Sequence, residues 1–208
     1  MPRGRFVSFE GMDGAGKSTH IAWFAARLRS FGLEVLETRE PGGSELAESL
    51  RALLLGSPMD DVTELLLMFA ARRDHVVGVI EPALRAGRWV VCDRFTDSTR
   101  AYQGGGRHMS SERIEWLADW VHAGTWPDRT YLFDLAPEVA ARRRSAARAP
   151  DRFEAETAAF FERVREVYLA CSAKEASRFA VIDGTESVET IRGRLDDDLA
   201  RLVATARA

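Results

Sequence analysis

Short apolar runs alternate along the chain with longer stretches in which apolar residues recur at helical spacing. The short runs predict five strands, at residues 6–9, 35–38, 89–92, 130–135 and 180–182. The longer stretches predict helices from 17 to a stop at Gly32, then at 44–54, 60–85 with a bend near Gly78, 111–122, 137–147, 153–172 and 187–203, and the three glycines at 104–106 predict a loop. The strands are continuously apolar and are separated by helices. This pattern favours an α/β fold with a mostly parallel sheet.

Composition and charge narrow the classes of protein. The chain has 208 residues, 46% apolar and 29% charged, which is close to the globular average. No repeat or long linker divides it, so we expect one domain over 1–208. The net charge of −3 argues against a general nucleic-acid binder. No apolar run approaches the roughly 20 residues of a membrane span, and the start lacks the apolar stretch of a signal peptide. We expect a cytoplasmic protein that binds neither nucleic acid nor membrane.

The segment between the first predicted strand and the first predicted helix carries the strongest chemical signal. Residues 11–18 match the phosphate-binding pattern GxxxxGK[ST] in the strand-to-helix context that this pattern needs. The glycines let backbone N–H groups turn toward phosphate oxygens, and the helix N-terminus adds partial positive charge. Lys17 can reach the β- and γ-phosphates, and the Ser18 hydroxyl can bind Mg²⁺. The predicted ATP-binding residues are Gly11, Met12, Asp13, Gly14, Ala15, Gly16, Lys17, Ser18 and Thr19.

A second chemical signal follows the strand at 89–92, which ends in Asp93-Arg94. A carboxylate at this edge can hold the water shell of Mg²⁺, and the adjacent arginine can hold a second phosphate. The pair therefore suits transfer between two phosphorylated molecules. The Asn-Lys-x-Asp sequence by which GTPases read guanine is absent, because the chain has only two lysines, Lys17 and Lys174, and Ala173 precedes the second.

Cysteines and histidines add no further site. Cys92 and Cys171 form no CxxC pair, so neither a disulfide framework nor a cysteine-rich zinc site is predicted. The four histidines have no metal-ligand spacing and no triad partner, and we interpret them as structural or surface residues; they are His20, His75, His108 and His122.

Four motifs in order resemble the thymidylate kinase family over nearly the full chain. They are residues 9–19, 38–43 (Thr-Arg-Glu-Pro-Gly-Gly), 67–73 (Leu-Met-Phe-Ala-Ala-Arg-Arg) and 93–104, which includes Asp-Arg-Phe-Thr-Asp-Ser-Thr and Ala-Tyr-Gln-Gly. The resemblance implies a P-loop kinase fold, with a five-stranded parallel sheet flanked by helices and a helical, arginine-rich lid at about 142–153. It also implies transfer of the γ-phosphate of MgATP to dTMP, giving dTDP and ADP, as a step of dTTP biosynthesis by a homodimer.

The same resemblance implies roles for residues around dTMP. Arg39 and Arg94 are expected to hold the monophosphate. Phe69 is expected to stack on thymine and Arg73 to donate to a carbonyl oxygen of the base, since residues four apart share one helix face. Arg72 is then expected at the surface or an interface. The other implied dTMP-binding residues are Asp13, Ser98, Thr99, Tyr102, which would crowd a 2′-hydroxyl, and Gln103.

The lid is expected to supply cations to the transferring phosphate. Some members of the family carry an arginine at the position of Gly14, and this chain does not. Arg143 and Arg152 match the family pattern best, so the expected catalytic residues are Lys17, Arg94, Arg143 and Arg152.

Alternatives remain open at this stage. On its own, an aromatic at position 69 of such an apolar stretch is normally core, and a basic run is usually a solvated helix end. The alternative activities are a P-loop kinase for another (deoxy)nucleoside monophosphate and a non-catalytic nucleotide-binding regulator.

Overall fold

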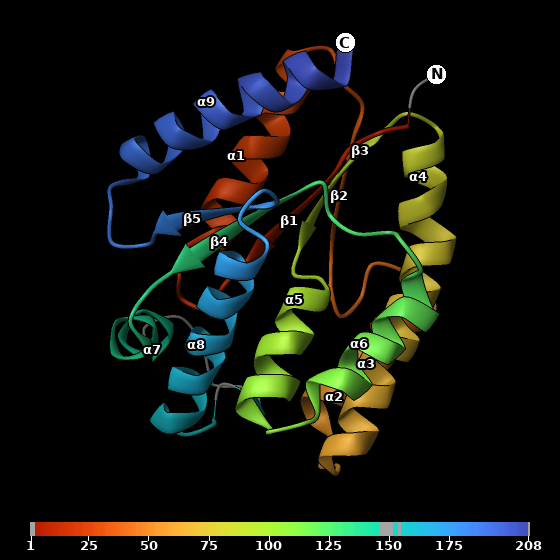
Figure 1. Ribbon diagram of the computed structural model, residues 1–208, viewed down its shortest axis with the longest axis vertical. Coiled ribbons are helices and arrows are strands. Elements are labelled where there is room, and N and C mark those ends of the chain that lie inside the picture. The colour runs from red at the N-terminus through yellow and green to blue at the C-terminus, as the bar shows by residue number, and fades with distance from the viewer. Residues whose placement is uncertain (1–2, 146–151, 154, 208) are drawn as a thin grey trace.

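The computed structural model describes residues 3–145, 152–153 and 155–207. Within these residues the sheet has five parallel strands in the order β2-β3-β1-β4-β5 (Figure 1). The strands are β1 Phe6–Glu10, β2 Val35–Arg39, β3 Trp89–Asp93, β4 Arg129–Asp134 and β5 Phe179–Asp183. All five predicted strands and their parallel arrangement are confirmed.

Helices flank the sheet and follow the predicted order. They are α1 Lys17–Ser30, α2 Glu45–Gly56, α3 Asp61–His75, α4 Glu81–Arg85, α5 Thr96–Thr99, α6 Ser111–His122, α7 Pro137–Ser145, α8 Ala158–Lys174 and α9 Val188–Arg207, with π-helical segments η1 Val76–Ile80 and η2 Arg100–Gly106. The predicted bend near Gly78 lies in η1, between α3 and α4. None of the helices in the described part of the chain combines the length and the apolar composition that a membrane span needs.

Both faces of the central strands are covered, which explains why their sequences are continuously apolar. Phe9 of β1 packs edge-on against Phe24 of α1 at a ring distance of 5.4 Å. Phe6 of the same strand faces the opposite way and packs edge-on against Phe95 at 4.9 Å. Figure 1 shows α1 beside α9 on one side of the sheet.

The loop predicted at the three glycines is wrong, because Gly104–Gly106 continue the helical segment η2. They are glycines because α8 packs directly against them. A Cβ at Gly106 would lie 2.3 Å from a ring carbon of Phe160, and one at Gly105 would lie 2.8 Å from the carbonyl oxygen of Arg163. The Arg163 guanidinium also donates to the carbonyl oxygens of Gly105 and Gly106.

The strand register gathers polar residues at one edge of the sheet. Asp93 is level with Phe9 on one neighbouring strand and with Arg39 on the other. Glu10 follows Phe9, so the carboxyl ends of β1, β2 and β3 meet. In open parallel sheets, ligands bind at this edge.

Candidate functional site

The loop between β1 and α1 has the geometry of a phosphate cradle. Gly11, Gly14 and Gly16 have φ of 126°, 87° and 100°, which side chains rarely adopt. At Gly11 the backbone also passes close to β4, since a Cβ there would lie 2.3 Å from the carbonyl oxygen of Phe133. The N-terminus of α1 follows, and its first turn carries no acidic residue. This loop can therefore present backbone N–H groups to an anion.

Lys17 is buried beneath this loop at 4% exposure. Its ammonium donates to the carbonyl oxygens of Gly11, at 2.8 Å, and Met12, at 3.2 Å. Burial lowers the pKa of this group. Among the other predicted ATP-binding residues, Met12 and Ala15 are buried, whereas Ser18 and Thr19 are exposed in the first turn of α1.

Arg94 joins the phosphate cradle to the rest of the site. Its Nη2 donates to Asp13 at 2.8 Å and to the Tyr102 hydroxyl at 3.3 Å. Its Nη1 donates to the hydroxyls of Ser98, at 3.1 Å, and Tyr168, at 3.2 Å. Burial alone would lower the pKa of Arg94, but Asp13 and the two tyrosines raise it well above its usual value. Arg94 is therefore a fixed positive charge.

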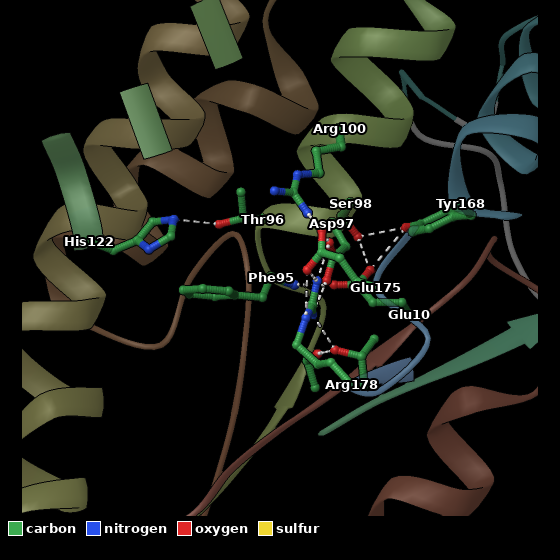
Figure 2. Close-up of polar contacts among 12 residues, drawn as sticks. Glu10, Phe95, Thr96, Asp97, Ser98, Arg100, His122, Tyr168, Glu175 and Arg178 are labelled. Carbon is green, nitrogen blue, oxygen red and sulfur yellow. Dashed lines mark hydrogen bonds and ion pairs between the residues drawn. The ribbon is translucent and has the colours of Figure 1, made fainter. Parts of the chain in front are cut away.

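Glu10 shares two hydroxyl partners with Arg94, those of Ser98 and Tyr168, and Figure 2 shows its contacts with them. Its carboxylate accepts the backbone N–H of Phe95 at 2.6 Å and the hydroxyls of Ser98, at 2.6 Å, and Tyr168, at 3.0 Å. Burial, with the nearby Asp97 charge, raises the pKa of Glu10 to about 7.

A cluster of ion pairs around Asp97, a residue of the short helix α5, holds this helix in place (Figure 2). Asp97 is fully buried and accepts from Arg100 at 3.0 Å and from Arg178 at 2.7 Å. Glu175 accepts from the same two arginines, at 2.7 Å from Arg100 and 2.8 Å from Arg178. Because α5 carries Ser98 and Thr99, these ion pairs position two of the predicted site residues.

A cavity opens beside Arg94 at the carboxyl edge of the sheet. Of the predicted site residues, it is lined by Asp13, Arg39, Asp93, Arg94, Ser98, Thr99, Tyr102 and Gln103. Its other lining residues are Glu40, Pro41, Arg51, Leu55, Met68, Arg72, Phe95 and Phe153. Arg39 is 55% exposed and pairs with Glu48 at 2.9 Å. The fold thus brings the predicted monophosphate arginines to one cavity.

The structure corrects the helix face predicted to meet the base. Phe69 and Arg73 lie outside the cavity, and Met68 and Arg72 line it instead. Phe69 is 2% exposed in an apolar cluster with residues of α6, and the Arg73 guanidinium donates to the carbonyl oxygen of Val121 at 2.7 Å. The expected surface position of Arg72 is wrong, because that side chain is only 3% exposed. One residue along a helix turns the face by about 100°, which accounts for the exchange.

The two expected lid arginines lie on different sides of the site. Arg143 donates to the carbonyl oxygen of Gly184 at 3.0 Å. A Cβ at Gly184 would lie 3.1 Å from the carbonyl oxygen of Ala15, so this contact is next to the phosphate cradle. Arg152 pairs with Glu64 at 2.7 Å, and its neighbour Phe153 lines the cavity. The middle of the predicted lid, 146–151, lies outside the described residues.

The site offers donors for a divalent cation at Asp93. Its Oδ1 atom is buried and has no hydrogen-bond partner among the described residues. The described residues contain no cluster of three or more His, Cys, Asp or Glu that could enclose a metal ion by themselves. A carboxylate with an open oxygen beside a phosphate cradle fits a hydrated cation that is shared with a nucleotide.

Comparisons with known proteins agree with this geometry. The family model described as Thymidylate kinase matches residues 9–194. A thymidylate kinase of Burkholderia vietnamiensis is 55% identical over 206 residues, which cover 97% of this chain and 100% of the relative. One of Cupriavidus necator is 55% identical over 205 residues, covering 98% and 99%. The crystal structure of a thymidylate kinase from Ehrlichia chaffeensis superposes with a TM-score of 0.76 at 32% identity, covering 97% of this chain and 99% of that one.

Proposed function

The chain belongs to the thymidylate kinase family, and from that premise we infer that it transfers the γ-phosphate of ATP to dTMP, giving dTDP and ADP. The observation that carries this function is the junction at Arg94, which links the phosphate cradle to the cavity through Asp13. A phosphoryl group must pass between two bound nucleotides, so the two sites have to touch.

We assign the phosphate contacts as follows. Lys17, at the start of α1, serves the β- and γ-phosphates of ATP. Arg94 and Arg39 serve the dTMP phosphate, because planar guanidinium groups match phosphate oxygens. Arg143, which lies next to the cradle, supplies further positive charge to the transferring group. No covalent intermediate is needed, since alignment and charge stabilisation account for catalysis in this type of transfer.

Asp93 and Ser18 fit a magnesium ion. The buried Oδ1 atom of Asp93 has no hydrogen-bond partner among the described residues, and Ser18 presents a hydroxyl at the start of α1. Mg²⁺ binds through one or two protein oxygens and keeps several waters. When bound, the ion would neutralise charge on the ATP phosphates.

We assign thymine recognition to Met68 and Arg72. The Met68 side chain lines the cavity, where its polarizable thioether can contact a flat ring. Arg72 lines the same cavity, and its buried Nη1 has no partner among the described residues, which suits donation to a carbonyl oxygen of the base. Tyr102 lines the same cavity, and we assign it to the sugar.

The decisive experiment is an ADP-release assay with ATP, Mg²⁺ and a panel of nucleoside monophosphates. A dTMP kinase gives its highest kcat/KM with dTMP, and lower values with dUMP, dCMP and dGMP. Highest kcat/KM with another monophosphate would assign a different substrate. Binding of both nucleotides without ADP release would favour the alternative of a non-catalytic nucleotide-binding regulator.

We also propose a homodimer that forms through an exposed apolar face on α3 and α6. Val62 and Leu66 of α3 are 51% and 53% exposed, and Trp116 and Trp120 of α6 are 62% and 71% exposed. These helices pack together and form an apolar groove lined by Val62, Leu66 and Trp116. A clustered apolar surface of this kind marks an interaction site. Trp120→Glu should shift the protein to a monomer in sedimentation analysis. Val181→Glu, on the exposed β5, is the matched control and should not.

A further inference from the structure

Arg72 is held tightly at one end of its guanidinium. Its Nε donates to Glu40 at 2.7 Å, and its Nη2 donates to the Thr99 hydroxyl at 3.1 Å. The rings of Phe69 and Phe95 lie 5.0 and 5.2 Å from the guanidinium carbon. These contacts leave Nη1 as the one guanidinium nitrogen with no described partner. Because the fork is rigid and planar, the direction of Nη1 is set by whatever fixes the other two nitrogens.

Glu40 supplies the strongest of these constraints. It is 4% exposed and pairs with Arg72 through its Oε2 atom. Burial alone would raise the pKa of this carboxyl, but the Arg72 charge and the contact with His75 lower it, so Glu40 is ionised. A buried carboxylate that met only one partner could still turn about its own side-chain bonds. The second oxygen therefore decides how firmly Arg72 is aimed.

His75 holds that second oxygen. It is fully buried, and its Nδ1 lies 3.0 Å from Oε1 of Glu40. A carboxylate can only accept, so Nδ1 carries a proton and donates it. On the other side of the ring, Nε2 lies 2.7 Å from the Thr38 hydroxyl. Both ring nitrogens are therefore engaged, and the ring cannot turn without losing a buried hydrogen bond.

The position of His75 also joins two parts of the site. It is the last residue of α3, the helix that carries Met68 and Arg72. Its ring packs against the turn after β2, where a Cβ at Gly43 would lie 2.3 Å from Nε2. That turn follows Arg39, which lines the phosphate end of the cavity. His75 thus links the loop at the phosphate end to the helix at the base end.

We propose that His75 is a positioning residue for base recognition. It fixes Glu40, and through Glu40 it holds the Arg72 guanidinium where Nη1 meets the 4-carbonyl oxygen of the pyrimidine. This inference rests on the proposed function, in which Arg72 contacts the base. It assigns a task to a histidine that the sequence pattern marks only as structural.

The test compares ligands that differ at the 5-methyl group and the 4-carbonyl group of the ring. Dissociation constants of dTMP, dCMP and dUMP are measured by calorimetry. Relative to dTMP, dCMP lacks the methyl group and also carries an amino group in place of the 4-carbonyl, so a fixed donor at Nη1 rejects it. dUMP lacks only the methyl group and therefore measures that contribution by itself. His75→Leu removes both ring hydrogen bonds and should lower the dTMP preference over dCMP about tenfold, the effect of about 1.4 kcal/mol. His75→Leu should change the dTMP preference over dUMP and the affinity for ATP by no more than about twofold from the wild-type values. That is the usual deviation between sites that act independently.

Conservative variants separate positioning from packing. His75→Asn keeps a donor near the place of Nδ1 and should restore most of the dCMP discrimination. Thr38→Val removes only the hydroxyl beyond the ring and should cause a smaller loss of the same sign. It keeps the test decisive if His75→Leu does not fold. Arg73→Ala is the matched control on the same helix, and it should leave the discrimination unchanged.

The outcomes distinguish this inference from the proposed function. If Arg72→Lys lowers the dCMP discrimination while His75→Leu and Thr38→Val do not, the positioning role is refuted and base reading by Arg72 stands. Unchanged discrimination in Arg72→Lys would instead refute base reading by Arg72. If His75→Leu weakens all three pyrimidine ligands and ATP equally, His75 is merely structural.

Discussion

Replacing Glu10 by Gln should change how stability depends on pH. The pKa of this buried carboxyl is raised from 4.5 to about 7. Between these values the folded protein binds a proton that the unfolded chain releases. Stability from this group is therefore complete below pH 4.5 and is lost as pH rises through 7. The shift corresponds to a loss of about 3 kcal/mol at pH 8, by 1.36 kcal/mol per unit.

Glutamine preserves the shape of the site but cannot ionise. The hydroxyls of Ser98 and Tyr168, which lie against Glu10, can either donate or accept, so they can adapt to an amide. The assay is urea unfolding of the wild type and Glu10→Gln at half-unit steps from pH 4.5 to 8. The stability of the variant minus that of the wild type should increase across this range by about 3 kcal/mol. A difference that stays constant with pH would refute a raised pKa at Glu10.

His122 should make stability depend on pH in the direction opposite to Glu10. It is 1% exposed beside Thr96, and burial, with the Arg72 charge nearby, lowers its pKa from 6.5 to about 3. The contribution of His122 to the free energy of unfolding is complete above pH 6.5. It decreases by about 2 kcal/mol between pH 6.5 and 5. In the wild type the two groups oppose each other over that range. The variant, which keeps only His122, should therefore lose stability on acidification more steeply than the wild type.

Three further outcomes are expected from single substitutions. Lys17→Ala should lower turnover by about 10²–10³, because it removes the charge that we assign to the β- and γ-phosphates of ATP; rapid-quench kinetics check this. Arg143→Ala and Arg152→Ala should lower kcat far more than they raise the KM for dTMP if both stabilise the transition state, and an unchanged kcat in either would remove that residue from catalysis. Met68→Ala should raise the KM for dTMP about three- to tenfold by losing the ring contact, whereas Phe69→Ala should mainly lower the free energy of unfolding, by about 3–5 kcal/mol. A larger KM effect at Phe69 than at Met68 would restore the stacking role to the phenylalanine.

Local patterns predicted the fold well because strands and helices each have a simple pattern of apolar residues: continuous runs in the strands and helical spacing in the helices. The buried strands are continuously apolar since helices cover both sides of the sheet, and the glycines of the phosphate cradle mark positions where φ is positive. The run at 104–106 failed as a prediction because its glycines serve a close approach by α8, as the space at Gly106 shows, and not a turn. Sequence alone does not distinguish these two uses of glycine.

The site was predictable where a motif fixed the spacing and less so where a helix had to be oriented. Two adjacent pairs, Met68–Arg72 and Phe69–Arg73, share the spacing of four residues, so periodicity could not choose between them. The structure places the first pair in the cavity because Glu40, from a distant loop, pairs with Arg72. Glu40 and His75 lie 35 residues apart, and no pattern in the sequence connects them.

The strand order has a consequence for biosynthesis of the chain. β1 is the central strand, yet both strands that pair with it, β3 and β4, come much later in the sequence. At 5–20 residues per second, the ribosome needs roughly 6–25 s after β1 to complete β4. During that time the strand preceding the phosphate cradle has no native partner on at least one edge. The loop that begins at Gly11 is thus synthesised well before both strands that support β1, so a nascent chain stalled before Asp134 should not retain ATP.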